Sequence, residues 1–221
     1  IGLWVLTLTL TCGAGAAFPA PGSRASAQAG LSHGDPARRA ESVAWFAEHG
    51  RMSDQPRLLA RLRDDDPEVR GLAEQALWML WMRSGDAKID RLMEAGVAQM
   101  QAGQHAEAVA TFSEIIRRRP AFAEGWNKRA TVHWLMGNFK ASIADICETV
   151  KREPRHFGAY SGLGMIRAEM NEPARAVAAF ELARKYNPHI VGLDAEIARL
   201  KALGGDVPAD PLGCEQQTAS R

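Results

Sequence analysis

Apolar residues recur along residues 89–190 at the i, i+3, i+4 spacing of amphipathic helices, and the whole arrangement repeats. Pro120, Pro154 and Pro188 stand 34 residues apart. Four further sets of positions keep the same step: Gly96, Ala130 and Gly164; Gly103, Gly137 and Asn171; Val109, Ile143 and Val177; Phe112, Ile146 and Phe180. A period of this length, held over three copies, is typical of repeat proteins built from stacked helix pairs.

The residue types at these positions indicate how each pair folds. The small residues allow two helices to approach closely, and Gly or Asn after the first helix allows the left-handed backbone that ends it. The bulky apolar residues face inward from the second helix, which the prolines stop. The predicted helices are 89–102, 105–118, 123–136, 139–152, 157–170 and 173–186. A seventh, over 191–203, is expected to cap the open end of the last pair.

The repeated positions resemble those of the tetratricopeptide repeat family. The third unit carries Tyr160, Leu163, Gly164, Ala176, Phe180, Ala183 and Pro188; the second carries Trp126, Ala130, Ile146 and Pro154; the first carries Leu92, Gly96, Ala108, Phe112 and Pro120. The family's Tyr position differs in all three units and holds Gln99, His133 and Arg167. The resemblance implies a right-handed α-solenoid of three helix pairs, 89–122, 123–156 and 157–190, with a concave protein-binding face. The stretches 122–131, 141–146 and 153–164 are similar to exported single-module tetratricopeptide proteins of proteobacteria.

The segment 41–88 also has a helical pattern. Asp66 and Pro67 form a strong helix start, and the stretch 59–77 resembles one HEAT-type helical repeat. The alternative is a plain helical cap for the solenoid, and both interpretations place these helices against the first repeat. Trp78 and Trp81 lie one turn apart and are expected to pack against Ile89, Leu92 and Met93.

The first residues have the features of an export signal. Residues 1–20 carry no charge, 1–10 are mostly apolar, and Ala25-Ser26-Ala27 offers a cleavage site, with Ala14-Gly15-Ala16 as an earlier one. We therefore predict a signal peptide over 1–27, a flexible linker over 28–40 and a periplasmic or secreted protein. The chain starts at Ile1 without a Met, which suggests a truncated record. An uncleaved membrane anchor is the competing interpretation. The Gly- and Pro-containing end, 204–221, is expected to be disordered.

Composition narrows the function. The chain is 46% hydrophobic and 24% charged with a net charge of +1, which is ordinary for a globular protein and gives no general attraction to nucleic acid. Cys147 and Cys214 can pair in an oxidising compartment, although their spacing does not require it. The sequence holds no phosphate-binding loop, zinc spacing or nucleophile–base pair. We expect no enzyme activity, no cofactor, no metal and no membrane insertion of the mature chain.

The first helix of each pair should line the concave face. Helical register places nine candidate partner-binding residues there: Met93, Val97, Met100, Asn127, Lys128, Thr131, Trp134, Ser161 and Met165. Methionine, tryptophan and amides suit a peptide or a partner helix. Asn127 and Lys128 alone hint at carboxylate capture. The alternatives are a self-assembling solenoid without a separate client, and a solvated face with no partner.

Overall fold

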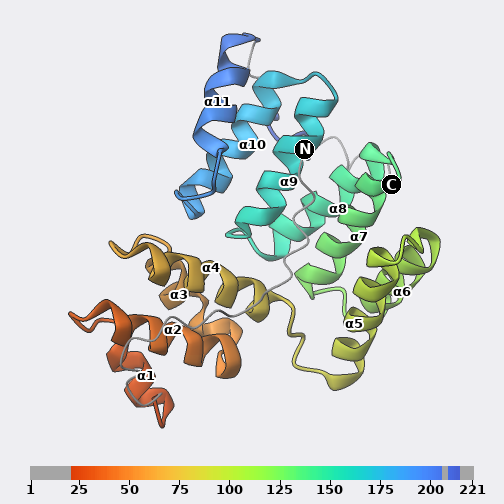
Figure 1. Cartoon of the computed structure of the whole chain (residues 1–221). Helices are drawn as coiled ribbons and strands as arrows, with labels where there is room; N and C mark the ends of the chain where they lie inside the picture. The colour runs from red at the N-terminus through yellow and green to blue at the C-terminus, as the bar shows by residue number, and fades with distance from the viewer. Residues whose placement is uncertain (1–20, 206–208, 215–221) are drawn as a thin grey trace.

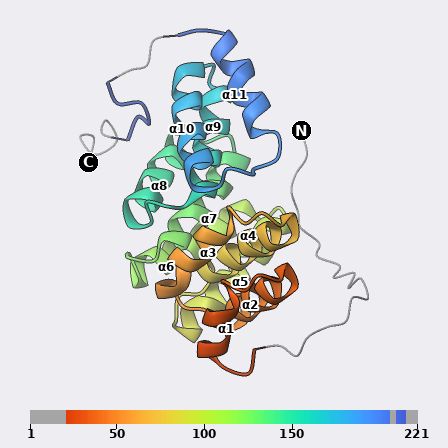
Figure 2. The same cartoon turned by 90° about the vertical axis from the view of Figure 1, so that its left-hand side faces the viewer.

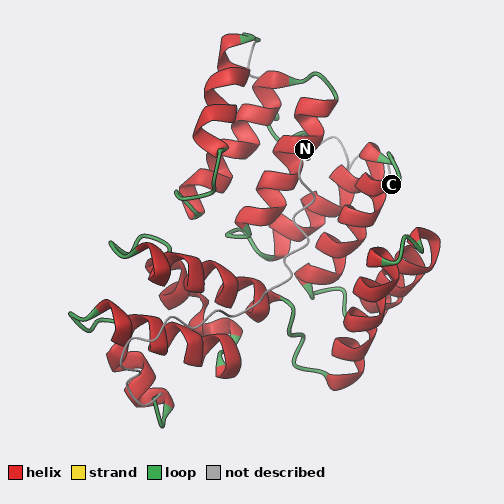
Figure 3. Ribbon diagram, viewed as in Figure 1, coloured by secondary structure: helices red, strands yellow, loops and turns green. Residues whose placement is uncertain are grey.

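The computed structural model describes residues 21–205 and 209–214, and in this part of the chain the regular elements are helices (Figures 1 and 3). An N-terminal bundle precedes the repeats. It comprises α1 (Arg24–Gly30), α2 (Pro36–His49), the short 3-10 helix η1 (Met52–Asp54), α3 (Gln55–Arg61) and α4 (Pro67–Trp81). The repeats comprise α5 (Ala87–Gln101), α6 (His105–Arg118), α7 (Ala123–Leu135), α8 (Phe139–Arg152), α9 (Phe157–Glu169) and α10 (Pro173–Tyr186), followed by α11 (Leu193–Ala202).

The six repeat helices confirm the predicted pairs to within two or three residues at each end. Helix α5 packs on α6, α7 on α8 and α9 on α10, and each pair stacks on the next through α6–α7 and α8–α9 contacts (Figure 2). Gly103, Gly137 and Asn171 follow the first helices with φ of 74°, 73° and 58°, so the left-handed turn predicted from their residue types is present. The result is the expected all-helical solenoid.

Small residues permit the close approach of the two helices in a pair. A Cβ atom added to Gly96 would lie 2.6 Å from Cε1 of Phe112, and one added to Gly164 would lie 2.5 Å from Cδ1 of Phe180. Both phenylalanines are buried. The two repeated positions are therefore one structural unit, in which the aromatic ring of the second helix occupies the space that the glycine of the first leaves open.

Helix α11 confirms the predicted cap. Its buried residues Leu193, Ile197 and Leu200 belong to a core cluster with Phe180 of α10, and α11 packs on α10. This helix covers the apolar side of the last repeat, which would otherwise face water.

The structure does not support a flexible linker over 28–40. Helix α1 lies inside this region in part, Asp35 caps α2 through a 2.9 Å hydrogen bond from the Ala37 amide, and Ala27 and Leu31 are buried in one core with Phe46. These two buried apolar side chains hold the segment in place. The mainly small and polar composition of 28–40 therefore predicted flexibility wrongly. Cleavage after Ala27 would cut α1 in two. Residues 1–20 of the predicted signal peptide lie outside the described residues.

The N-terminal bundle is helical as predicted, but it packs elsewhere than expected. Trp78 and Trp81 contact His156 and Phe157 at the start of α9, with ring centroids 4.0–5.5 Å apart, while Ile89 belongs to a separate core cluster. Further bonds tie the bundle to the loop between α8 and α9 and to the end of α10: Arg155 to Gln55 at 2.9 Å, Asn187 to Glu74 at 3.2 Å and Arg63 to the Lys185 carbonyl at 2.6 Å. The bundle thus lies along the loop edge of the second and third repeats.

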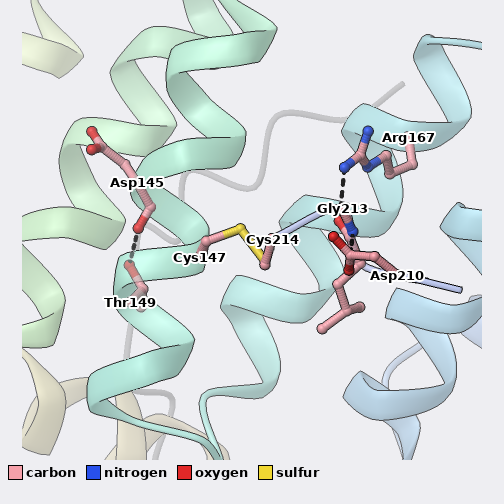
Figure 4. Close-up of a disulfide and its surroundings, with 8 residues drawn as sticks. Asp145, Cys147, Thr149, Arg167, Asp210, Gly213 and Cys214 are labelled. Atoms are coloured by element: carbon pink, nitrogen blue, oxygen red, sulfur yellow. Dashed lines mark hydrogen bonds between the residues drawn. A yellow bond between two sulfur atoms is a disulfide. The ribbon is translucent and has the colours of Figure 1, made fainter. Parts of the chain in front are cut away.

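The end of the chain is ordered over 209–214, contrary to the expectation of a disordered tail. Cys214 forms a disulfide with Cys147 of α8, and the Leu212 carbonyl accepts a 2.7 Å hydrogen bond from Arg167 of α9 (Figure 4). Leu212 packs against the cores of the last two repeats. The covalent bond and the buried guanidinium both fix a segment whose composition alone predicts no structure. Residues 206–208 and 215–221 lie outside the described residues.

Replacing two helical glycines by alanine distinguishes the effect of close helix packing on stability from the effect of helix propensity. We expect Gly164→Ala to lower the free energy of unfolding by about 1–3 kcal/mol, because the new methyl group meets Phe180. The control is Gly71→Ala in α4, where no atom lies within 4 Å of the added Cβ. That change should instead stabilise by about 0.5–1 kcal/mol through helix propensity. Urea unfolding followed by circular dichroism measures both, and equal effects of one sign would contradict this explanation.

Candidate binding groove

One face of α7 lies in the middle of the surface that the stacked helix pairs are expected to make concave, and we call this surface the groove. Helical spacing places Glu124, Lys128, Thr131 and Leu135 in one row, with Asn127 and Trp134 beside it. The Trp134 indole donates a 3.1 Å hydrogen bond to Glu169 of α9, so the inward faces of the second and third repeats meet across this surface.

A buried charged cluster closes the end of this face near the start of α7. The carboxylate of Glu124 is 3.1 Å from Nζ of Lys128, accepts 3.2 Å hydrogen bonds from Asn127 and lies 2.9 Å from Nε2 of His156. Burial alone would raise the pKa of Glu124, but the charge of Lys128 and the bond from His156 outweigh it and hold the pKa to about 2. Glu124 is therefore ionised and fully partnered.

Hydrogen bonding assigns the tautomer of His156. Its Nδ1 accepts a 3.1 Å bond from the Ala159 amide and so caps α9. An accepting Nδ1 carries no proton, so the ring proton is on Nε2 and is donated to Glu124. The same ring stacks on Trp81, with centroids 4.0 Å apart and planes 18° from parallel. One side chain thus connects α4, α7 and α9.

The chain's own Trp78 covers the neighbouring part of the groove. Its ring lies 5.8 Å from Nζ of Lys128, in cation–π geometry, and against Gly158 of α9, where any Cβ would collide with it. The N-terminal bundle therefore fills the groove at the start of α7 and α9.

The other end of the groove is open and apolar. Met165 of α9 is 43% exposed and Leu135 of α7 is 37% exposed, and Trp134 and Thr131 of α7 are half-buried. Thr131 uses its hydroxyl on the Asn127 carbonyl at 3.0 Å. This surface offers apolar and aromatic contacts with few free polar groups.

The nine predicted groove residues do not all lie on this open surface. Met93 is 1% exposed and packs in the core of the first repeat, so it is not available to a partner. Asn127 and Lys128 are held by Glu124, which leaves no free clamp for a carboxylate there. The remaining predicted positions are half-buried or exposed: Val97, Met100, Thr131, Trp134, Ser161 and Met165.

Sequence reasoning missed the contacts that close the groove. Glu124 falls in the predicted register, but its burial depends on His156 and on Trp78, which is distant in sequence.

The residues at the family's Tyr position make polar contacts instead of aromatic ones. Gln99 accepts a 2.7 Å bond from Thr111 of α6, and Arg167 bonds Glu172 at 2.7 Å, so polar contacts between elements replace the aromatic ring there.

Comparison with known proteins identifies the repeats. The sequence model of the tetratricopeptide repeat family matches residues 93–154 and 127–190. A TPR repeat-containing protein of Rhizobium etli is 33% identical over 119 residues, which are 54% of this chain and 58% of that protein. The Hsp70-Hsp90 organizing protein of Triticum aestivum is 25% identical over 74% of this chain and 28% of its own length. The chain thus spans little more than half of the first relative and less of the second.

A solved structure has the same fold. The first TPR domain of Spaghetti (RPAP3), bound to the HSP90 peptide SRMEEVD, is 20% identical, with a TM-score of 0.51 over 54% of this chain and 97% of that domain. Residues 93–190 are therefore tetratricopeptide repeats. Repeats of this family mediate protein–protein interaction.

The buried carboxylate predicts a specific response to acid. Because the pKa of Glu124 is depressed in the folded state, its contribution to stability is present above the ordinary value of 4.5 and is lost as pH falls towards 2. Glu124→Gln should lower the free energy of unfolding by roughly 3 kcal/mol at pH 7, and this deficit should shrink between pH 5 and pH 3. Denaturant unfolding at each pH measures the difference from the wild type.

The exposed Glu94 of α5 supplies the control for the pH series. Glu94→Gln should match the wild type at every pH, since it removes a carboxylate without a buried partner. A deficit of Glu124→Gln that stays constant from pH 7 to pH 3 would contradict the ionised state of Glu124.

Proposed function

We propose that this chain is a non-catalytic interaction module of the cell envelope that holds a peptide or partner helix in the open half of its concave groove. The observation that carries the proposal is the apolar strip of Leu135, Trp134 and Met165, which lies on the face that repeats of this class use for partners. Exposed Met and Leu beside a Trp form an adaptable contact surface for the apolar side of a ligand.

The closed half of the groove narrows the class of partner. Lys128, the cation nearest to the middle of the groove, is paired with Glu124 and covered by Trp78. A ligand that depended on its terminal carboxylate would find no free ammonium group there. An amphipathic helix or an extended apolar segment fits the strip better, because it needs contact area and not a charge partner.

Photo-crosslinking tests the groove directly. A benzoylphenylalanine residue placed at Met165 or at Leu135 should crosslink to the same partner in an extract of cells that make the chain. The matched control is Lys140, which is exposed on α8. Trp134→Ala should weaken the Met165 crosslink by roughly tenfold, the loss expected of an aromatic contact of this kind.

Two outcomes would contradict this proposal. Equal crosslinking from Lys140 would show that the strip has no special role. A crosslink that forms between copies of the purified chain alone would instead favour the self-assembling solenoid.

We further propose that the chain works in an oxidising compartment after export. The Cys147–Cys214 disulfide supports this, because such bonds persist outside the reducing cytosol. The apolar run over 1–10 supports an export signal. Among the described residues no helix has the length and apolar character needed to cross a membrane. Since α1 begins at Arg24, we place the cleavage after Ala16 and not after Ala27.

Mass spectrometry of the chain recovered from cells tests export. We expect a mature N-terminus directly after Ala16, and we expect Cys147 and Cys214 to resist alkylation until a reductant is added. An uncleaved chain with two reactive thiols would contradict export. A start at Gln28 would keep export but contradict the role of α1 in the core.

A further inference from the structure

A cavity of about 220 Å³ lies between the N-terminal bundle and the loop edge of the repeats, separate from the groove's open strip. Residues of the bundle, of the loop between α6 and α7 and of the loop between α8 and α9 line it, including Trp81, Arg119 and Arg152. The two loops repeat at a 34-residue step, but the bundle wall belongs to this chain's own N-terminal segment.

One of the residues that line this cavity carries an unpartnered hydrogen-bond donor. Trp81 is 3% exposed, and its indole Nε1 has no hydrogen-bond partner among the described residues. A buried N–H group without an acceptor is unfavourable by about 1–3 kcal/mol. A ligand or water that supplies an oxygen atom in the cavity removes that cost.

The charges around the cavity favour an anion. Arg83 donates to the neutral carbonyls of Ala47 and Gly50. Arg119 is exposed and makes no side-chain hydrogen bond within the described residues; its charge helps to lower the pKa of Asp86, which does not line the cavity. The two carboxylates that line the cavity are paired with cations that do not line it. Glu124 is paired with Lys128, and Glu153 lies 3.9 Å from Arg155.

The rest of the lining limits the shape of the anion. Met52, Phe122, Ala121 and Ala123 provide an apolar wall beside the Trp81 ring. A cavity of this size is below the usual range for drug-sized ligands, so the occupant must be small. A carboxylate on a compact aromatic or aliphatic body satisfies the donor, the cations and the apolar wall together.

We propose that this cavity binds a small carboxylate with an apolar body. The carboxylate accepts from Trp81 Nε1 and pairs with Arg119, while its body packs against Phe122 and Met52. Such a ligand would contact both the bundle and the repeats and so stabilise their junction. The carboxylate belongs either to a free organic acid or to the C-terminal residue of a peptide.

The probes are phenylacetate, N-acetylphenylalanine and N-acetylphenylalaninamide, titrated into the full chain. The readout is the ¹H–¹⁵N resonance of the Trp81 indole, assigned with Trp81→Phe. We expect a carboxylate probe to shift this resonance at millimolar concentration. Arg119→Gln should weaken binding about tenfold, because a charge-assisted bond is lost. Arg117→Gln, which alters an exposed arginine paired with Glu114 outside the cavity, should leave binding unchanged.

Each outcome decides the proposal. A shift by phenylacetate alone supports a free acid, and a stronger response to N-acetylphenylalanine supports a peptide C-terminus. Equal binding of N-acetylphenylalaninamide would overturn the need for a carboxylate. Unmoved resonances with all three probes would mean that water alone occupies the cavity, and equal weakening by Arg117→Gln would reduce the effect to general surface charge.

Discussion

The contacts of His156 hold the N-terminal bundle, the second repeat and the third repeat together. Its ring caps α9 through Nδ1, donates to Glu124 of α7 through Nε2 and stacks on Trp81 of α4. The two hydrogen bonds need one tautomer, and all three contacts need the same ring orientation, so they support one another. Both the covered half of the groove and the cavity at the loop edge depend on this junction, because Trp78 and Trp81 contact the start of α9 at His156, Phe157 and Gly158.

The junction also determines what the groove can bind. A tetratricopeptide groove with free cations can select a ligand by charge, whereas here the ionised Glu124 neutralises Lys128 within the chain. The energetic reason is burial. The Glu124 carboxylate is 1% exposed and would be strongly unfavourable without a partner, so Lys128 serves as its counter-ion. The surface left for the partner that we propose is the apolar strip around Trp134 and Met165, where burial of apolar area would drive association.

Residue types and the 34-residue period predicted the repeats well, but they did not predict how the N-terminal bundle packs on them. The left-handed turn at Asn171 and the contact of Gly164 with Phe180 follow from residue type and a fixed period, and both are present. Met93 shows the limit of register arguments, because a small rotation turns a groove residue into a core residue. Trp78 shows a second limit. Its partners on α7 and α9 lie far along the chain, and nothing in a helical periodicity states which surface another helix will cover.

Contacts between residues distant in sequence also order residues 209–214, here through a disulfide. The stretch 209–214 has too few apolar residues to hold itself against the solenoid, and Leu212 alone would not offset the entropy of ordering it. The Cys147–Cys214 bond lowers the entropy cost of ordering this stretch, and Arg167 donates a hydrogen bond to the Leu212 carbonyl within it. Arg167, which departs from the family pattern in the third unit, thus bonds to a segment outside the repeats. In this chain the repeats supply regular surfaces, and the segments flanking them determine which of those surfaces stay open.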